Sequence, residues 1–275
     1  MQPFAVTLQF NERVPIVSFA VATALKSAAV FFGMLVLSEV GRRVGIARAA
    51  RDPESATKGA GPIEAAVFGL LGLLLAFSFS GAASRFEARR HLVVSEANAI
   101  GTAYLRLDLL PADAQPEMRQ LFRDYLDARL ALYGRVTDSL SVTKAQAEVA
   151  RLQGRIWTES VSAAQRPGMP TSTAILLIPA LNEMIDITTT RTVATQNHPP
   201  AIIFQLLIAF SLTCALLAGY SMSATRHRNW FYTLMVSLTL SFTLYVIFDL
   251  EYPRFGLIRI DSPDQILVEL RNSIR

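Results

Sequence analysis

Apolar residues run almost without interruption from Ile63 to Ala83, a stretch long enough to cross the hydrocarbon core of a bilayer. The chain then becomes polar, with no proline before Pro111. Pro62 suits the first position of a helix, whereas Pro111 cannot continue one. The pattern therefore predicts one helix, or two nearly collinear helices, from Pro62 to Leu110. At about 1.5 Å per residue this helix would extend roughly 70 Å, well beyond a bilayer.

Three other apolar stretches have the length of a membrane span. The first lies within Pro15–Val40, the third is Ala201–Ala224 and the fourth is Trp230–Leu250. Four spans in total place both termini on the same side of the membrane. The first span is not predicted to be a cleaved signal peptide, because its apolar run is too long and basic residues follow it rather than precede it.

A polar segment between the second and third spans is predicted to be a helical insert outside the membrane. Gln115–Val136 carries apolar residues at a helical spacing, and Ser141–Gln165 is a weaker amphipathic segment. Thr171–Gln196 begins apolar and ends polar. Strand patterns are weak throughout. The insert has too little sequence for a large core of its own, so it is expected to pack as a bundle on extensions of the spans.

These elements define an all-α integral membrane protein with four transmembrane helices and a helical extramembrane insert. Residues 1–84 hold spans one and two, 85–199 the insert, 200–251 spans three and four, and 252–275 a C-terminal tail. Composition agrees, since 52% of the residues are hydrophobic and only 17% are charged, which is more apolar than an average soluble domain.

Little in the chain points to enzyme chemistry. The three histidines are scattered, and neither a P-loop nor a dinucleotide fingerprint occurs. There is also no zinc-type spacing and no basic tail, so no metal site, cofactor or nucleic-acid partner is predicted. The net charge of +4 reflects arginines at the membrane edges. The single cysteine, Cys214, is predicted to be a small buried hydrophobic residue within the third span.

Two faces of the second span are candidates for lining a path for ions. One face presents Leu73 and Phe77, with Gly69 and Gly81 completing the row. A ring of apolar side chains can gate a path by dewetting, whereas glycines also allow ordinary close packing of helices. The competing face presents four other apolar residues, which are Phe68, Leu71, Leu75 and Phe79.

Small hydroxyls follow at a helical spacing toward the end of the second span. Ser78, Ser80 and Ser84 can donate hydrogen bonds to a passing anion, or bond back to the preceding turn of their own helix. Lys26 lies within the first apolar stretch, either as an intramembrane charge or at the membrane boundary.

Charged side chains cluster where the second and fourth spans end. Arg85, Arg89 and Arg90 would attract anions if they ringed a pore mouth. Alternatively, they extend toward lipid headgroups or pair with Glu87 and Glu96. Asp249 and Glu251, at the end of the fourth span, form either an acidic ring or an ordinary span terminus.

Several motifs carry a resemblance to a known family. The sequence from Ser84 to Arg89, SRFEAR, resembles the end of the second span of bestrophin channels, and DLEYPRFG from Asp249 resembles the acidic segment after their fourth span. One aromatic residue of the first motif is absent, and Arg254 separates proline from phenylalanine in the second. The chain is more similar to a group of bacterial bestrophin-like membrane proteins, through LLLAFSFSGAASRFEAR, EANAIGTAYLRLDLLP, LNEMIDITTTR and the HPP before span three.

The resemblance implies a homo-oligomer, a pentamer, in which the second span lines an ion pathway with an apolar neck and passes mostly anions. It makes pore-lining candidates of Leu73, Phe77, Phe68, Leu75, Ser80 and Ser84, and pore-mouth charges of Arg85, Arg89 and Arg90. The alternative is a membrane-anchored scaffold whose insert binds a partner and transports nothing.

The resemblance also implies the bacterial inner membrane, with the termini and the insert in the cytosol. The distribution of basic residues does not decide the orientation, because seven lie near span ends on each side. Basic residues in long segments carry less weight in the positive-inside rule than those in short loops. With that weighting, the rule favours termini outside the cytosol. The cytosolic expectation therefore rests on the resemblance alone.

Overall fold

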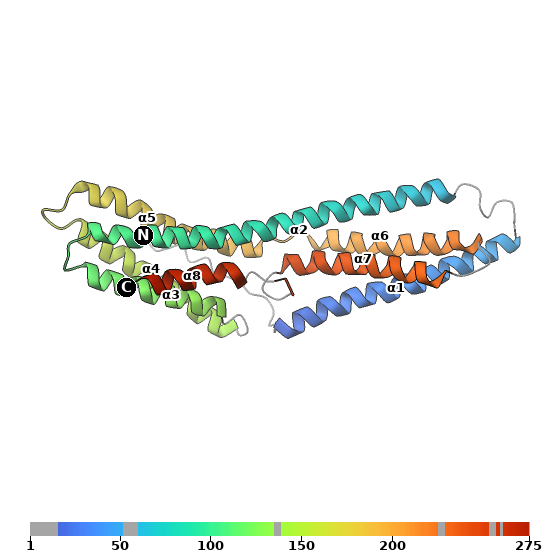
Figure 1. Ribbon diagram of the computed structural model, residues 1–275, viewed down its shortest axis with the longest axis horizontal. Coiled ribbons are helices and arrows are strands. Elements are labelled where there is room, and N and C mark those ends of the chain that lie inside the picture. The colour runs from blue at the N-terminus through green and yellow to red at the C-terminus, as the bar shows by residue number, and fades with distance from the viewer. Residues whose placement is uncertain are drawn as a thin grey trace. The chain divides into compact units, whose positions relative to one another are not determined.

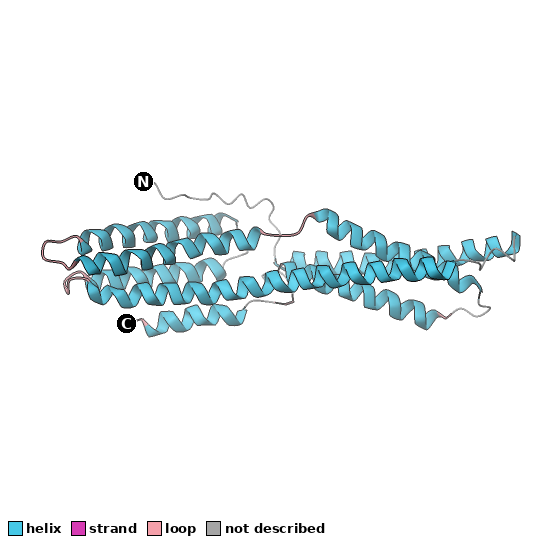
Figure 2. Ribbon diagram, turned by 90° about the horizontal axis from the view of Figure 1, so that it is seen from above, coloured by secondary structure: helices cyan, strands magenta, loops and turns pink. Residues whose placement is uncertain are grey.

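The structure is a computed structural model that describes residues 16–51, 60–134, 139–224, 229–252, 257–258 and 261–274. Within these ranges it contains helices and no strand, as Figures 1 and 2 show. The elements in chain order are α1 (Ile16–Arg51), α2 (Ala60–Leu105), η1 (Arg106–Leu109), α3 (Gln115–Gly134), α4 (Ser139–Ala164), α5 (Thr171–Gln196), α6 (Ala201–Ser221), η2 (Met222–Ala224), α7 (Trp230–Glu251) and α8 (Asp261–Ser273).

The chain forms two compact units, and α2 contributes to both. The membrane unit contains residues 17–86 and 198–258, which hold α1, the first part of α2, α6 and α7. The insert unit contains residues 87–197 together with α8.

Among the described residues, four helical stretches are long and apolar enough to cross a membrane, which agrees with the predicted number of spans. They are Ala20–Arg51, Gly61–Leu109, Thr171–Ser221 and Trp230–Glu251. The third stretch runs through both α5 and α6. The all-α membrane fold expected from the hydrophobic pattern is therefore the fold of the chain.

The long helix predicted from Pro62 is present as α2, a single α-helix of 46 residues (Figure 1). It passes into the short 3-10 helix η1 just before Pro111, where the missing N–H prevents further helix. The expectation of one continuous helix that is apolar first and amphipathic later is thus confirmed.

The first helix is longer than predicted. The predicted first span lies within Pro15–Val40, but α1 continues to Arg51. Glu39 accepts hydrogen bonds from Arg42 at 3.3 Å and from Arg43 at 2.8 Å, and pairs at these spacings stabilise a helix. Arg42 and Arg43 therefore support the continuation of the helix beyond the predicted span.

Glycines bring α1 and α6 into backbone contact within the membrane unit. A Cβ atom on Gly41 would lie 2.0 Å from the carbonyl oxygen of Leu216. A Cβ atom on Gly219 would lie 1.9 Å from the carbonyl oxygen of Ser38. Small residues permit this kind of approach between membrane helices, which is held by van der Waals contact rather than by the hydrophobic effect.

The core of the membrane unit receives side chains from all four of its helices. Buried residues include Met34 of α1, Leu71 of α2, Cys214 of α6 and Leu244 of α7. Cys214 is fully buried, as expected for a small hydrophobic residue in a span.

The insert unit buries apolar side chains of its own helices together with those of the second part of α2, which continues beyond the apolar span. The predicted apolar face of α3 is buried at Leu121, Phe122, Tyr125 and Leu126. Further buried residues come from the second part of α2, with Ile100, and from α8, which the prediction did not count.

Helix α8 was missed because the last 24 residues were predicted only as a tail. Its sequence contains a recognisable start, Asp261-Ser-Pro, followed by apolar residues at a helical spacing. Leu267 is fully buried, and Arg271 donates to Asp127 of α3 at 2.7 Å and 2.8 Å. The hydrogen bond to Asp127 also raises the pKa of the Arg271 guanidinium.

The glycine contact predicts a large penalty for one added methyl group. Gly41→Ala should lower the free energy of unfolding by about 1–3 kcal/mol, because its Cβ meets backbone that cannot move aside. Gly154→Ala in α4 is the matched control, since a Cβ there meets nothing within 4 Å and should be neutral or stabilising. Thermal unfolding in detergent measures both. Equal midpoints for the two variants would contradict the contact.

Candidate functional site

One side of α2 is exposed in the membrane unit. Leu73 is 52% exposed and Phe77 is 68% exposed, although both are large apolar residues. Other residues on the same side of the helix, before and after this pair in the chain, are exposed as well. We call this side the open face of α2, and its exposed residues are Ala66, Gly69, Leu73, Phe77, Ser80 and Ser84.

The competing row of α2 mostly packs into the core. Leu71 is 1% exposed and Leu75 is 8% exposed, and Phe68 is partly buried against the same cluster. Phe79, the last member of that row, is exposed. The structure thus separates two candidate faces that the sequence left open: Leu75 and Phe68 hold the unit together, and Leu73 and Phe77 do not.

Polar residues follow the apolar pair along the open face. Ser80 and Ser84 are exposed, and no hydrogen bond of either hydroxyl occurs within the described part of the chain. On the next turn Glu87 pairs with Arg90 at 2.9 Å and lies 3.4 Å from His91. The exposed side of α2 therefore changes from apolar through hydroxyl-bearing to charged.

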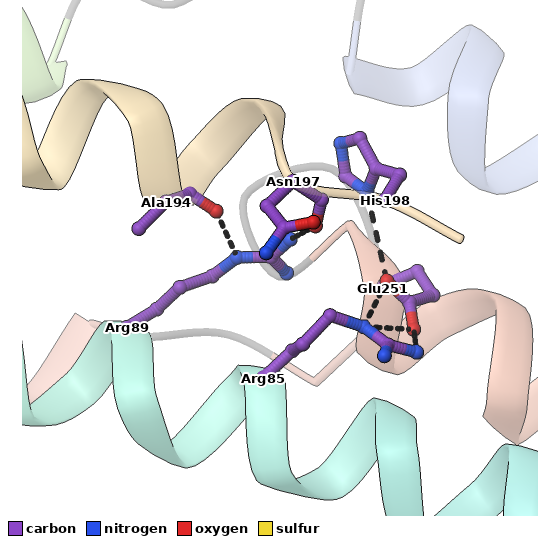
Figure 3. A network of polar contacts seen from close by, with 6 residues as sticks. All are labelled: Arg85, Arg89, Ala194, Asn197, His198 and Glu251. Carbon is purple, nitrogen blue, oxygen red and sulfur yellow. Dashed lines mark hydrogen bonds and ion pairs between the residues drawn. The ribbon is translucent and has the colours of Figure 1, made fainter. Parts of the chain in front are cut away.

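Arg85 makes an ion pair with the end of α7 (Figure 3). Its Nε donates to the two carboxylate oxygens of Glu251, at 2.9 Å from Oε1 and 3.2 Å from Oε2. His198 Nδ1 lies 3.6 Å from the same Oε2. Glu251 is fully buried, and a buried carboxylate is costly unless a cation compensates it. The predicted pore-mouth role of Arg85 thus competes with a structural one.

Arg89 closes the C-terminal end of α5. It is buried, and it donates from Nε to the carbonyl oxygen of Ala194 and from Nη2 to that of Asn197, each at 3.0 Å (Figure 3). The last carbonyl groups of a helix have no partner within the helix, and a guanidinium satisfies them well. Arg89 is therefore not presented to solvent as an isolated charge.

The two acidic residues that the sequence offered as partners for these arginines, Glu87 and Glu96, have different partners from each other. Arg90 pairs with Glu87, which is one of the alternatives named for it. Glu96, in contrast, is fully buried and pairs with Arg129 at 2.6 Å and with Arg191. This second buried ion pair, within the insert unit, was not foreseen.

The acidic pair at the end of α7 has two different structural partners. The Asp249 carboxylate accepts the backbone N–H groups of Leu257 at 2.9 Å and Ile258 at 2.7 Å, while Glu251 faces Arg85. No group of three histidine, cysteine or acidic side chains is placed to hold a metal ion among the described residues. Lys26, the other charged candidate, is exposed on α1.

The four spanning helices and the helical insert define a class of α-helical membrane proteins. A family model described as the Bestrophin-like domain matches residues 27–263, and the chain therefore belongs to the Bestrophin-like family. No curated protein matches the chain.

Solved structures share the fold. Two crystal structures of a bacterial bestrophin homologue from Klebsiella pneumoniae, each with one substitution, superpose with TM-scores of 0.69 and 0.67 at 16% identity. These alignments cover 90% and 89% of this chain, and 96% and 99% of the homologue. A crystal structure described as a membrane protein with one substitution gives a TM-score of 0.66 at 17% identity, covering 90% of this chain and 97% of that one. At such identity the likeness establishes the fold.

The pairing of Arg85 predicts a stability defect on its removal. Arg85→Ala should lower the free energy of unfolding by about 3 kcal/mol, because Glu251 loses its guanidinium partner. Arg90→Ala is the matched control, since the exposed pair with Glu87 contributes at most about 1 kcal/mol. Thermal unfolding in detergent distinguishes the two. A smaller loss for Arg85→Ala than for Arg90→Ala would contradict the structural role of Arg85.

Proposed function

We propose that the protein is an ion channel in which several copies of the chain surround a common axis and the open face of α2 lines the path. The observation that carries this proposal is the exposure of Leu73 and Phe77 on a helix whose opposite side is buried in the core of its own unit. Membership of the Bestrophin-like family supports it. The family resemblance favours a pentamer.

The proposed path has its narrowest part at Leu73 and Phe77. Copies of these side chains around an axis form an apolar constriction, which resists wetting and so closes the path without a moving plug. Ser80 and Ser84 continue the path with groups that can donate hydrogen bonds to an anion. Phe68 and Leu75 support α2 from behind rather than line the path, since both pack in the protomer.

We propose that the path conducts anions, because the family resemblance favours them and the serine hydroxyls can donate hydrogen bonds to them. Arg85 and Arg89 contribute less to this preference than the sequence suggested, because each is already bonded within its own unit. A test of selectivity by reversing the charge of Arg85 or Arg89 would therefore disturb folding first. Reversal potential in a salt gradient is the cleaner measurement.

The proposed location is the bacterial inner membrane, with the lipid bilayer as the surroundings of α1, α6 and α7 and with both termini and the insert in the cytosol. The exposed apolar residues of these helices, such as Phe32, Ile202 and Phe242, fit contact with lipid. The orientation follows the family resemblance.

A second candidate is a membrane-anchored scaffold that transports nothing. The exposed apolar residues Ile175 and Leu176 at the start of α5 favour it, because they offer a partner protein a hydrophobic contact on the insert unit. Bilayer recordings separate the two functions directly.

Conduction is tested by opening the apolar constriction. The double variant Leu73→Ala, Phe77→Ala should raise conductance several-fold in reconstituted bilayers, because a wider ring wets more easily. The matched control is Leu238→Ala, Phe242→Ala in α7, a leucine and a phenylalanine at the same spacing and with 52% and 63% exposure. It should leave conductance unchanged.

The same recordings test the ion. In a potassium chloride gradient the reversal potential of the opened variant should lie near the equilibrium potential of chloride. Folded, oligomeric protein that leaves bilayers impermeable to chloride and to potassium in both the wild type and the opened variant would exclude the channel and leave the scaffold.

Orientation is tested with a reporter fused after Arg275. A fluorescent protein that matures only in the cytosol should be bright, and alkaline phosphatase at the same position should be inactive. High phosphatase activity would reverse the proposed orientation and agree with the charge rule instead.

A further inference from the structure

The second half of α1 carries an exposed row of side chains that changes from apolar to basic. Val36, Val40 and Val44 follow one another at intervals of four residues and are 61%, 42% and 53% exposed. Arg48 comes four residues later and Arg51 three residues after that, and both are exposed. Residues three or four apart are neighbours on a helix, so these five side chains form one continuous row, which we call the α1 row. It extends roughly 22 Å along the helix.

The α1 row passes out of the hydrocarbon core of the bilayer. Helix α1 has 36 residues. At the rise of an α-helix this length is roughly 54 Å, against about 30 Å for the hydrocarbon core, so part of α1 lies among headgroups. The exposed residues Trp230, Phe231 and Tyr232 begin α7, at the same end of the membrane unit as the end of α1 (Figure 1). Aromatic side chains concentrate where the bilayer meets water, so they mark that boundary.

The end of α6 relates the α1 row to these aromatic residues. A Cβ atom on Gly45 would clash with the side chain of Ser223, just after α6. The neighbouring Met222 has its Sδ 3.9 Å from Oγ1 of Thr233, in the first turn of α7. Gly45 therefore lies close to the level of the aromatic residues. The valines of the α1 row lie at the depth of the acyl chains, and its two arginines lie at the depth of the headgroups.

The charge at this end of α1 favours an anionic partner. Residues 39–58 include five basic side chains and three acidic ones, so the segment is positive overall. Neither Arg48 nor Arg51 makes an ion pair within the part of the chain that the structure describes. A guanidinium binds phosphate oxygens through two N–H groups at once. A zwitterionic lipid would bring its own ammonium group beside these arginines, whereas an acidic lipid would balance their charge.

We propose that the α1 row binds an acidic phospholipid, with the phosphate held by Arg48 and Arg51 and the acyl chains lying along the three valines. The exposed valines offer van der Waals contact to an acyl chain, and the arginines follow at the distance at which a headgroup follows its chains. The site stands whether or not the protein conducts ions. Its partner is a lipid rather than free phosphate, because free phosphate would leave the valines uncovered.

Native mass spectrometry of the detergent-purified full chain tests the site by counting bound lipids. The protein is titrated with phosphatidylglycerol or with phosphatidylcholine that carries the same acyl chains. Phosphatidylglycerol should bind about ten-fold more tightly, because each arginine near a headgroup favours a negatively charged lipid.

The variants separate charge at the α1 row from charge elsewhere. The double variant Arg48→Gln, Arg51→Gln should bind the two lipids equally well, and its unfolding midpoint without added lipid should match the wild type, because both side chains are exposed. Arg48→Lys, Arg51→Lys should retain most of the preference, because it keeps the charge. The matched control is Arg151→Gln, Arg155→Gln, which removes two exposed arginines from α4 of the insert unit and should leave the preference unchanged.

Two results would overturn the lipid site. They are equal binding of the two lipids by the wild type, and an undiminished preference in Arg48→Gln, Arg51→Gln. Glycerol phosphate should not displace the lipid, because it has no acyl chain to lie against the valines. Displacement would indicate a site for soluble phosphate and would also refute the lipid site. None of these measurements involves ion flow, so the lipid site and the channel can fail independently.

Discussion

A fully buried carboxylate needs a cation beside it, and this requirement sets the rotation of α2 about its own axis. In the membrane unit the carboxylate is Glu251, and Arg85 of α2 supplies the charge. In the insert unit the carboxylate is Glu96 of α2 itself, and Arg129 and Arg191 compensate it. Within each unit the charged side of α2 is therefore turned inward.

With that side fixed, the opposite side of α2 packs against no other described part of the membrane unit. Leu71 faces the core on the charged side, while Leu73 and Phe77 remain exposed. An exposed apolar residue on a spanning helix contacts either lipid or another protein chain. The open face around Leu73 contains glycine, alanine and serine as well as large residues. Small residues are typical of faces where membrane helices approach one another, so this face suits a contact between copies around an axis better than a surface in contact with lipid only.

The sequence predicted the architecture well because length, hydropathy and proline positions are local signals. The four spans, the continuity of α2 and the bounds of α5 all follow from such signals. The extension of α1 beyond Val40 was not predicted, because the apolar stretch that marks the span ends there. Glu39 pairs with Arg42 and Arg43 along the helix and supports its continuation.

The site was less predictable because its partners lie far apart in the chain. Nothing local connects Arg85 with Glu251, or Glu96 with Arg129. The sequence therefore left the arginines near the end of the span between a charged pore mouth, contact with lipid headgroups and pairs with Glu87 or Glu96. The two candidate faces of α2 had equally apolar rows, and only the packing of Leu71 and Leu75 against the core distinguishes them. A buried acidic residue that follows an apolar span is itself a signal that a distant cation must reach it.

The central claim is that copies of the chain place the open face of α2 around a common axis. Particle images of the detergent-purified protein, averaged without imposed symmetry, test this most directly. The account predicts a ring with rotational symmetry, five-fold by the family resemblance, in which Leu73 and Phe77 of every copy face the axis. A monomer, or a ring whose axis is lined by α1 or α7 while the open face of α2 contacts lipid, would contradict it.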